Sequence, residues 1–398
     1  MSRLPLTNPV AIAREYQVDD GSNTLLKVNN GVSIEVGLKE DIGSVHPHVK
    51  LCRQLPGERQ DSWIAISLDS PTSRRDVVQY DGGSLLWGNG SQQARLVDTV
   101  MGGLPEFRLD AILLDRPLTD VVRFKLEYSN CSFHYQGQLT PEQIRAGRNR
   151  PDRVVGSYAV RRSDGKKNNM YQTGKVFHLF RPLVTDWAGQ SIYADIRLEK
   201  IDDNSSWLDV IIDPVWLSHA TYPVVVDPDI GYTTIGASNS SIENTAYGYE
   251  FTMTEAGTLD SISAYCIENG STGAHTTECA VYEADDTRLA VSAQKNDWVN
   301  ATAAWGTHTV SGSPSLSNAA TYRALCGSSG GGSTLSLYYD DNISAQNPAL
   351  ISYTLGSYPD PGTAVSTTTE DYSVYVTYTA GGGGGNGEDG MYYYMMNQ

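Results

Sequence analysis

Short runs of alternating hydrophobic and polar residues, bounded by turn-forming residues, recur along most of the chain. Alternation with a period of two is typical of strands that bury one face. Runs before residue 230 lie at 63–68, 77–80, 84–87, 107–114, 121–128, 131–136, 154–161, 176–184, 192–198, 207–217 and 222–228. Later runs lie at 249–253, 259–267, 278–285, 288–294, 306–312, 321–327, 333–341, 350–355 and 372–379. The pattern predicts an all-β protein.

One segment departs from the strand pattern. Thr140 is suited to a helix N-cap, Pro141 to the first helical position, and Gly147 to the residue just past a helix end. These signals predict a short helix between Thr140 and Gly147.

The chain is too long for one ordinary core, because 398 residues exceed the usual domain size of about 100 to 200. We predict two domains that meet near Pro228. Residues 1–50 are expected to form an N-terminal arm and residues 51–229 a β-sandwich. Residues 230–380 are expected to form a second sandwich, jelly-roll-like because its short strands are evenly spaced, and residues 381–398 a glycine-rich linker and tail.

Charge is distributed unevenly between these predicted domains. The net charge is -17, and only three of the 29 Lys and Arg residues lie beyond residue 229, against 17 of the 46 acidic residues. So acidic a half repels phosphates, which argues against nucleic acid as a partner. Residues 1–20 lack the pattern of a secretion signal, and no apolar run approaches the ~20 residues of a membrane span. We therefore predict a soluble chain made in the cytoplasm, without a membrane partner.

The five cysteines show no CxxC motif and no Cys/His metal spacing, which fits reduced thiols. Cys266 and Cys279 face each other across a hairpin in one interpretation and are unpaired buried thiols in the other. The pattern alone leaves both open.

A resemblance adds to this picture. The run Val215-Trp216-Leu217, Ala220 and Tyr222 to Pro228 resembles a "WL…A…YPV-x-VDP" segment that closes a β-domain in bacterial surface and phage-encoded proteins. The continuation 231–236 is similar to uncharacterised phage virion proteins, as are the segments 139–142, 150–160 and 173–178. The likeness covers roughly residues 105 to 236 and implies a virion component with no established activity. Residues 236–380 resemble carbohydrate-binding-like modules in fold pattern, which says little about a ligand.

Two speculative ligand sites lie in the second half. Trp298, Tyr338 and Tyr339 stand near predicted strand ends, where aromatic rings stack on sugars, whereas Trp305 is assigned to the core. Acidic pairs at predicted turns are candidates for structural calcium if their loops converge, and are ordinary turn residues if they do not. These pairs are Asp285 with Asp286 and Asp340 with Asp341. No other cofactor is expected.

The chain ends in five glycines followed by an apolar, aromatic segment. A glycine-rich linker does not order itself, while large amphipathic side chains favour contact with a partner. We predict an assembly anchor that docks on a neighbouring subunit. Its residues are Met391, Tyr392, Tyr393, Tyr394, Met395 and Met396.

The sequence contains no HExxH or phosphate-loop motif, and neither Gly156-Ser157 nor Ser329-Gly330 is predicted to form a GxSxG nucleophile elbow. The leading hypothesis is a non-enzymatic phage structural protein, a capsid or neck decoration protein displaying its acidic domain outward. Its partners are then other virion proteins and further copies of this chain. The alternative is a tail or fibre adhesin that binds a host surface glycan, and a weaker third class is a glycan-cleaving enzyme.

Overall fold

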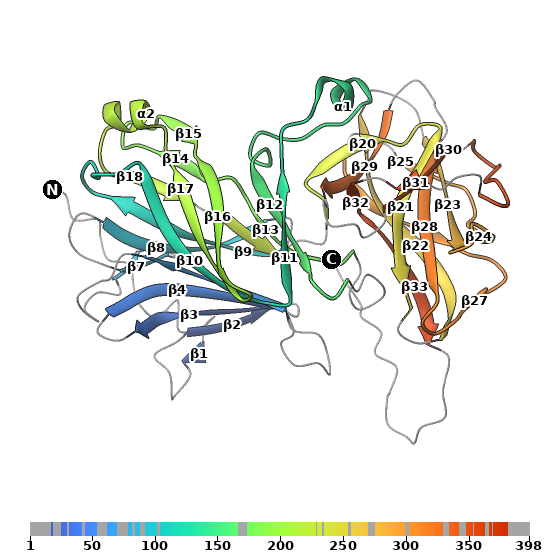
Figure 1. The fold of residues 1–398 in the computed structure, drawn as a ribbon, viewed down its shortest axis with the longest axis horizontal. Coiled ribbons are helices and arrows are strands. Elements are labelled where there is room, and N and C mark those ends of the chain that lie inside the picture. The colour runs from blue at the N-terminus through green and yellow to red at the C-terminus, as the bar shows by residue number, and fades with distance from the viewer. Residues whose placement is uncertain are drawn as a thin grey trace, which may run out of the picture.

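The computed structural model shows a mostly β protein with several antiparallel sheets, one of them curled into a half-barrel (Figure 1). It describes side chains at 50–52, 62–69, 109–165, 173–227, 235–253, 256–268, 275–296, 302–328, 335–341, 351–352, 354–362 and 369–379. Only the backbone is described for further strand residues, at 17–18, 25–29, 32–41, 44–49, 53, 79–81, 84–87, 92–101, 104–108, 229–232, 269, 297–298, 334, 348–350, 366–367 and 380.

Two sheets make up the first unit, which we define as the strands up to residue 232. An eight-stranded sheet has the order β1-β2-β3-β4-β5-β10-β17-β16. Its strands are β1 (Gln17–Val18), β2 (Leu25–Asn29), β3 (Val32–Asp41), β4 (Ser44–Arg53), β5 (Ser62–Leu68), β10 (Val121–Ser129), β17 (Ser205–Ile211) and β16 (Asp195–Asp202). Residues expected to form an arm therefore add four strands to this sheet.

The second sheet of the first unit has eleven strands, and its main path is β11-β12-β13-β19-β9-β18-β14-β15. These are β11 (Cys131–Gln136), β12 (Ser157–Arg162), β13 (Lys175–Leu179), β19 (Asp229–Tyr232), β9 (Leu104–Leu113), β18 (Val224–Asp227), β14 (Leu183–Thr185) and β15 (Ser191–Tyr193). Off this path, β8 (Gln92–Met101) pairs β9, and β7 (Ser84–Trp87) joins β8 to β6 (Gln79–Asp81). Because β19 pairs β13 and β9, the first unit continues to Tyr232, past the predicted boundary.

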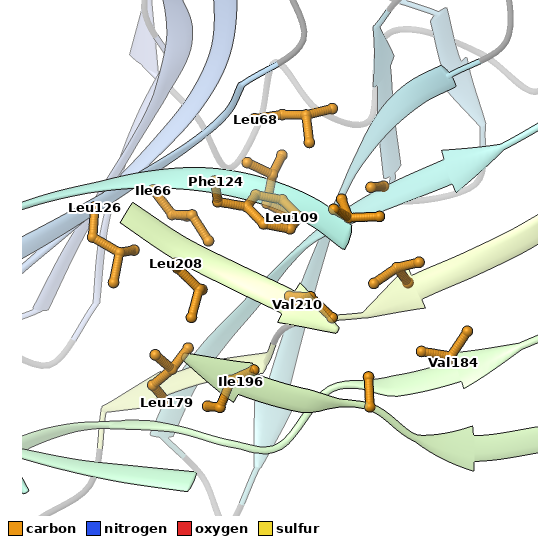
Figure 2. Packing of buried hydrophobic residues seen from close by; sticks show 14 of the residues in the cluster. Ile66, Leu68, Leu109, Phe124, Leu126, Leu179, Val184, Ile196, Leu208 and Val210 are labelled. Carbon is orange, nitrogen blue, oxygen red and sulfur yellow. The ribbon is translucent and has the colours of Figure 1, made fainter. Parts of the chain in front are cut away.

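The core of the first unit lies between these two sheets (Figure 2). Alternating residues of β5 and β10, such as Ile66 and Phe124, face Leu109 of β9 and Leu179 of β13, and all four are fully buried. Burying a large aliphatic or aromatic side chain contributes about 1.5–3 kcal/mol. The period-two pattern of the sequence thus determines which face of each strand points inward.

The second unit, residues 235–380, has two seven-stranded sheets. One contains β20 (Ser238–Ser241), β29 (Thr334–Asp341), β22 (Gly257–Asn269) and β26 (Ala304–Thr309), with β27 (Ser315–Leu316), β32 (Glu370–Tyr372) and β33 (Val374–Ala380) beside them. The other contains β24 (Arg288–Val291), β23 (His275–Glu283), β28 (Thr321–Ser328), β21 (Thr245–Thr252), β30 (Pro348–Ser352), β31 (Ser366–Thr367) and β25 (Lys295–Trp298).

A second core fills the space between these sheets and includes Ile262, Leu337 and Val376 on one side and Tyr249 and Val281 on the other. The opposite face of the β23–β28 sheet carries a smaller cluster that includes Tyr282 and Tyr358. Each unit thus has a core of its own.

Two short helices lie among the described residues of the first unit. Helix α1 (Pro141–Arg145) has Thr140 as its N-cap in a capping box with Gln143, and Gly147 follows it at positive φ, which confirms the predicted helix. Helix α2 (Pro214–His219) falls where the sequence suggested one continuous strand to Leu217. Asp213 ends that strand because its carboxylate accepts hydrogen bonds from the first backbone N–H groups of α2. No helix in the described part of the chain has the length and apolar character needed to cross a membrane.

Candidate functional site

The two units meet along a surface of opposite charges, which we call the junction. Strands β12 and β13 and the loop after α1 present basic groups to the acidic ends of β29 and β32. The basic side is formed by Arg148, Arg150, Arg161 and Lys175, and the acidic side by Asp340, Asp341, Glu370 and Asp371.

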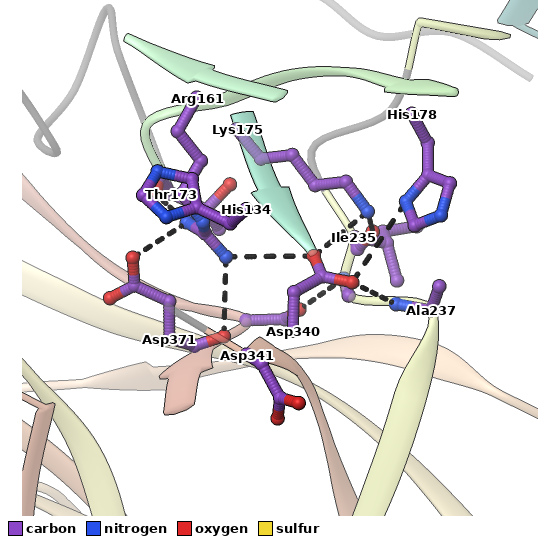
Figure 3. A network of polar contacts seen from close by, with 12 residues as sticks. His134, Arg161, Thr173, Lys175, His178, Ile235, Ala237, Asp340, Asp341 and Asp371 are labelled. Carbon is purple, nitrogen blue, oxygen red and sulfur yellow. Dashed lines mark hydrogen bonds and ion pairs between the residues drawn. The ribbon is translucent and has the colours of Figure 1, made fainter. Parts of the chain in front are cut away.

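Asp340 is the most deeply buried of the acidic groups, and Figure 3 shows the basic side chains around it. Its Oδ2 lies 2.8 Å from Nζ of Lys175, and both side chains are fully buried. Arg161 approaches the same oxygen at 3.5 Å, and the backbone N–H of Ala237 donates to Oδ1 at 2.9 Å. Lys175 also donates to the backbone oxygen of Ile235 at 2.8 Å. Two strands from different units are thereby joined through one carboxylate.

The pair of Lys175 and Asp340 is ionised at neutral pH. Burial lowers the pKa of Lys175 to about 8, although the negative charge of Asp340 acts to raise it. Burial alone would raise the pKa of Asp340, but the positive charges around it, Lys175 first, hold that pKa well below its usual value of 3.8. Burial and the neighbouring Lys175 hold the pKa of His178 well below 6.5, so its ring is neutral and contributes little to that charge.

Asp341 is held by a second set of contacts at the same junction. Nη2 of Arg150 lies 2.7 Å from its Oδ1, and Nε of Arg150 donates to the Ser238 hydroxyl at 2.9 Å. The Gln136 side chain exchanges two hydrogen bonds with the Asp341 backbone, at 2.8 and 3.0 Å. A side-chain amide that mimics a strand partner in this way ties β11 to the end of β29.

The junction continues on both sides of these pairs. Arg161 lies 3.1 Å from the carboxylate of Asp371, and Arg148 pairs with Glu370. The backbones of Asn149 and Asn239 exchange hydrogen bonds at 2.8 and 3.0 Å. Buried charges need partners in good geometry, so this complementarity restricts the two units to one arrangement.

These contacts correct the calcium hypothesis for Asp340 and Asp341. Both carboxylates neutralise basic side chains of the first unit instead of pointing into loops that gather oxygen ligands. Asp286 pairs with Arg323, and Asp285 caps its own turn by accepting from the Thr287 backbone at 3.0 Å. The described residues do not bring the two acidic pairs together.

The three aromatic residues of the predicted sugar site lie in different surroundings in the structure. Tyr339 is fully buried, so its ring has no face open to a sugar. The backbone of Trp298 pairs with His275 at the edge of β23, and its side chain lies outside the described residues. Tyr338 is half-buried and packs against Tyr265, with ring centroids 5.1 Å apart.

Tyr338 belongs to a larger aromatic group that the sequence did not reveal. Tyr265 also packs on Trp305 at 5.3 Å, and Trp305 packs on Tyr375 at 5.0 Å. All are half-buried, while their strand neighbours Ala264 and His308 are buried inside. Tyr338, Tyr265, Trp305 and Tyr375 thus form an aromatic strip on the outer face of the β22 sheet. The core assignment of Trp305 is wrong for this reason.

A serine, a histidine and an aspartate also align at the junction. The Ser157 hydroxyl lies 2.8 Å from Nε2 of His178, and Nδ1 of His178 lies 3.9 Å from Oδ1 of Asp340. The order is that of a hydrolytic triad, but 3.9 Å is too long for the orienting hydrogen bond. All three side chains are fully buried, so no substrate reaches the hydroxyl in this arrangement.

The predicted anchor, Met391 to Met396, lies outside the described residues. Sequence reasoning also passed over Arg148, Arg150, Arg161 and Lys175. Basic residues in a strand or a loop carry no local signal of their distant partners, although the burial of these four is unusual for their residue types.

Comparisons with known proteins give little guidance. No protein-family model and no curated protein matches the chain. A glycoside hydrolase family 43 arabinoxylan arabinofuranohydrolase from Bacillus subtilis aligns over 79% of this chain and 94% of its own, with 10% identity and a TM-score of 0.21. A GH32 beta-fructofuranosidase from Bombyx mori aligns over 80% and 78%, with 9% identity and a TM-score of 0.11. Scores this low carry no argument about fold or function.

Proposed function

We propose that this chain is a non-enzymatic structural protein of a bacteriophage particle, a decoration protein of the capsid or neck. In this proposal the first unit binds the particle and the acidic second unit projects outward. Each pair of sheets acts as a β-sandwich, the second of jelly-roll type. The observation that carries the proposal is the buried ionic junction, because a displayed module must keep one orientation on its base.

The segment with the phage resemblance supports this role through its place in the fold. Leu217 of α2 is buried in the first core, and Val224 and Val226 of β18 pair with β9 in the middle of the eleven-stranded sheet. The resembling residues therefore build the framework. Proteins that use the same structural domain would share the residues that build its framework.

An attachment surface is available on the first unit. Trp187 is 75% exposed and Val215 is 67% exposed. The two lie on neighbouring segments, because the Trp187 backbone N–H donates to Thr221, just past α2, at 2.8 Å. A large exposed aromatic beside an aliphatic residue is typical of a protein contact. We propose that another virion protein covers this surface.

Particle incorporation tests the proposal. Trp187→Ala is expected to lower the occupancy of the protein on purified phage particles by at least about tenfold, the effect of losing a central aromatic contact. Ile144→Ala changes a comparably exposed residue on α1 and is expected to leave occupancy unchanged. Densitometry should give hundreds of copies per particle for a head protein. If purified particles contain no copy of the chain, the proposal fails.

The aromatic strip favours a second candidate, a tail or fibre adhesin. Tyrosine and tryptophan rings on the outside of a sheet suit a flat sugar face. Saturable binding of the full-length protein on a glycan array, lost on Trp305→Ala and retained in Trp187→Ala, would support the adhesin. A copy number of a few to a few dozen would point the same way. Without sugar binding, decoration remains the better proposal.

A further inference from the structure

Three cysteines and a histidine converge inside the core of the second unit. Cys279 of β23 and Cys326 of β28 are directly opposite each other on neighbouring strands. His308 of β26 and Cys266 of β22 come from the facing sheet. The three cysteines are fully buried, and His308 is 1% exposed.

The distances in this cluster suit a metal ion. The Sγ atoms of Cys279 and Cys326 and a ring nitrogen of His308 all lie within 4.8 Å of one another. In a tetrahedral zinc site, bonds of about 2.0–2.3 Å place neighbouring ligand atoms roughly 3.5–3.8 Å apart. Small side-chain rotations therefore suffice to close the site. The side chain of Cys326 also lies within hydrogen-bonding reach of Cys266, which places a third sulfur, a candidate fourth ligand, next to these three residues.

His308 is oriented as a ligand. The Thr277 hydroxyl donates to the backbone oxygen of Lys295 at 3.4 Å, and its lone pair faces Nε2 of His308 at 3.2 Å. In the tautomer with the proton on Nε2, Nε2 donates to the Thr277 hydroxyl and Nδ1 is unprotonated. Nδ1 is buried and has no hydrogen-bond partner among the described residues.

Packing alone does not explain why Nδ1 of His308 is buried without a hydrogen-bond partner among the described residues. Buried thiols act as small hydrophobic groups and need no partner, but an imidazole nitrogen without a hydrogen bond loses free energy on burial. Metal-binding histidines commonly donate their second N–H to a fixed acceptor, and the Thr277 hydroxyl lies 3.2 Å from Nε2 of His308, where it can accept such a bond.

We propose that Cys279, Cys326 and His308 bind a zinc ion, with Cys266 as the fourth ligand. Thiolate and imidazole ligands favour Zn²⁺ over Ca²⁺ or Mg²⁺, and three cysteines with one histidine form a closed structural site. The ion would link the two facing sheets, since each contributes two ligands. Metal binding would then be part of the folding free energy of the second unit. This inference is independent of the proposed function.

Metal analysis of the full-length protein tests the site. Protein purified from zinc-supplemented medium is expected to contain about one zinc per chain by plasma mass spectrometry. Cys326→Ser should reduce this to less than about a tenth of the wild-type content, because one strong ligand is lost. Cys52→Ser removes a buried cysteine of the first unit and should retain the metal. Refolding with Co²⁺ should produce a thiolate-to-cobalt charge-transfer band in the wild type.

A gentler variant guards against misfolding. Thr277→Val keeps the shape but removes the acceptor that orients His308, and should weaken zinc affinity about 10–100-fold in competition with a chromophoric chelator. Circular dichroism establishes that this variant is folded. The proposal is overturned if wild-type protein holds no zinc after both growth and refolding in its presence. Equal metal loss in Cys52→Ser and Cys326→Ser, or unchanged affinity in folded Thr277→Val, would also overturn it.

Discussion

Lys175 and Asp340 come from different units and form an ion pair of 2.8 Å that is completely enclosed by protein. The first belongs to β13 and the second to β29. Because both side chains are fully buried, removing one of them leaves the other charge buried with fewer partners. The attachment of one unit to the other therefore depends on this pair more than on exposed contacts.

Breaking the pair should destabilise the protein strongly. Lys175→Met leaves the Asp340 carboxylate buried with fewer partners, and the free energy of unfolding should fall by about 3–5 kcal/mol in urea denaturation. The double variant Lys175→Met/Asp340→Leu should recover much of this loss, since no charge is left unpaired. Asp203→Asn, which breaks the exposed pair with Lys200, should leave the free energy of unfolding nearly unchanged, because solvent screens these charges. Equal losses for the buried and exposed pairs would contradict this interpretation.

Acid should weaken the junction through Asp340. Its pKa is depressed in the folded protein, so the unfolded chain takes up the proton first as pH falls. The stabilisation is therefore fully present above the usual pKa of 3.8 and is lost progressively below it. Unfolding free energies measured from about pH 5 to about pH 2 should decline more steeply in the wild type than in Lys175→Met/Asp340→Leu. Parallel curves would mean that Asp340 contributes nothing to acid sensitivity.

Close backbone contact should make Gly236 intolerant of a side chain. A Cβ at this position would lie 2.5 Å from backbone atoms of Tyr339, next to the junction. Gly236→Ala should therefore cost about 1–3 kcal/mol of unfolding free energy, because β29 must shift. Gly137→Ala is the control, since its nearest neighbour would be a side-chain atom of Tyr135 at 3.7 Å. Thermal denaturation of both variants distinguishes a local overlap from a general effect of losing glycine.

The buried serine should be chemically silent. Ser157 is enclosed, and the 3.9 Å separation between His178 and Asp340 leaves the imidazole without its orienting hydrogen bond. A fluorophosphonate probe should not label the folded protein, as mass spectrometry of the peptide containing Ser157 would show. Labelling that disappears in Ser157→Ala would instead reveal a hydrolase and would contradict the structural role proposed above.

Local signals in the sequence predicted local structure well. Thr140, Pro141 and Gly147 act within one helical turn, so their spacing alone predicts α1. Asp213 and Pro214 carry the same kind of signal for α2, but the hydrophobic run around them predicts one continuous strand. The alternation of hydrophobic and polar residues likewise predicts most strands, because every second residue of a strand points to its buried face.

Relationships between distant residues could not be predicted in this way. Adjacent aspartates such as Asp340 and Asp341 are common in turns, and the sequence around them does not indicate that Lys175 and Arg150 are their partners. Cys279, Cys326 and His308 have no regular spacing because they come from three strands. Trp305 shows the same limit, since one-residue changes in register decide whether a ring lies inside or outside.

Strand β19 has a consequence for the order in which the molecule forms. It is the last strand of the first unit in the chain, yet it lies between β13 and β9 in the interior of its sheet. During synthesis, residues 229–232 must therefore emerge from the ribosome before this sheet can be completed. Until then β13 and β9 each present an open edge, and the growing chain is most exposed to mispairing at that moment.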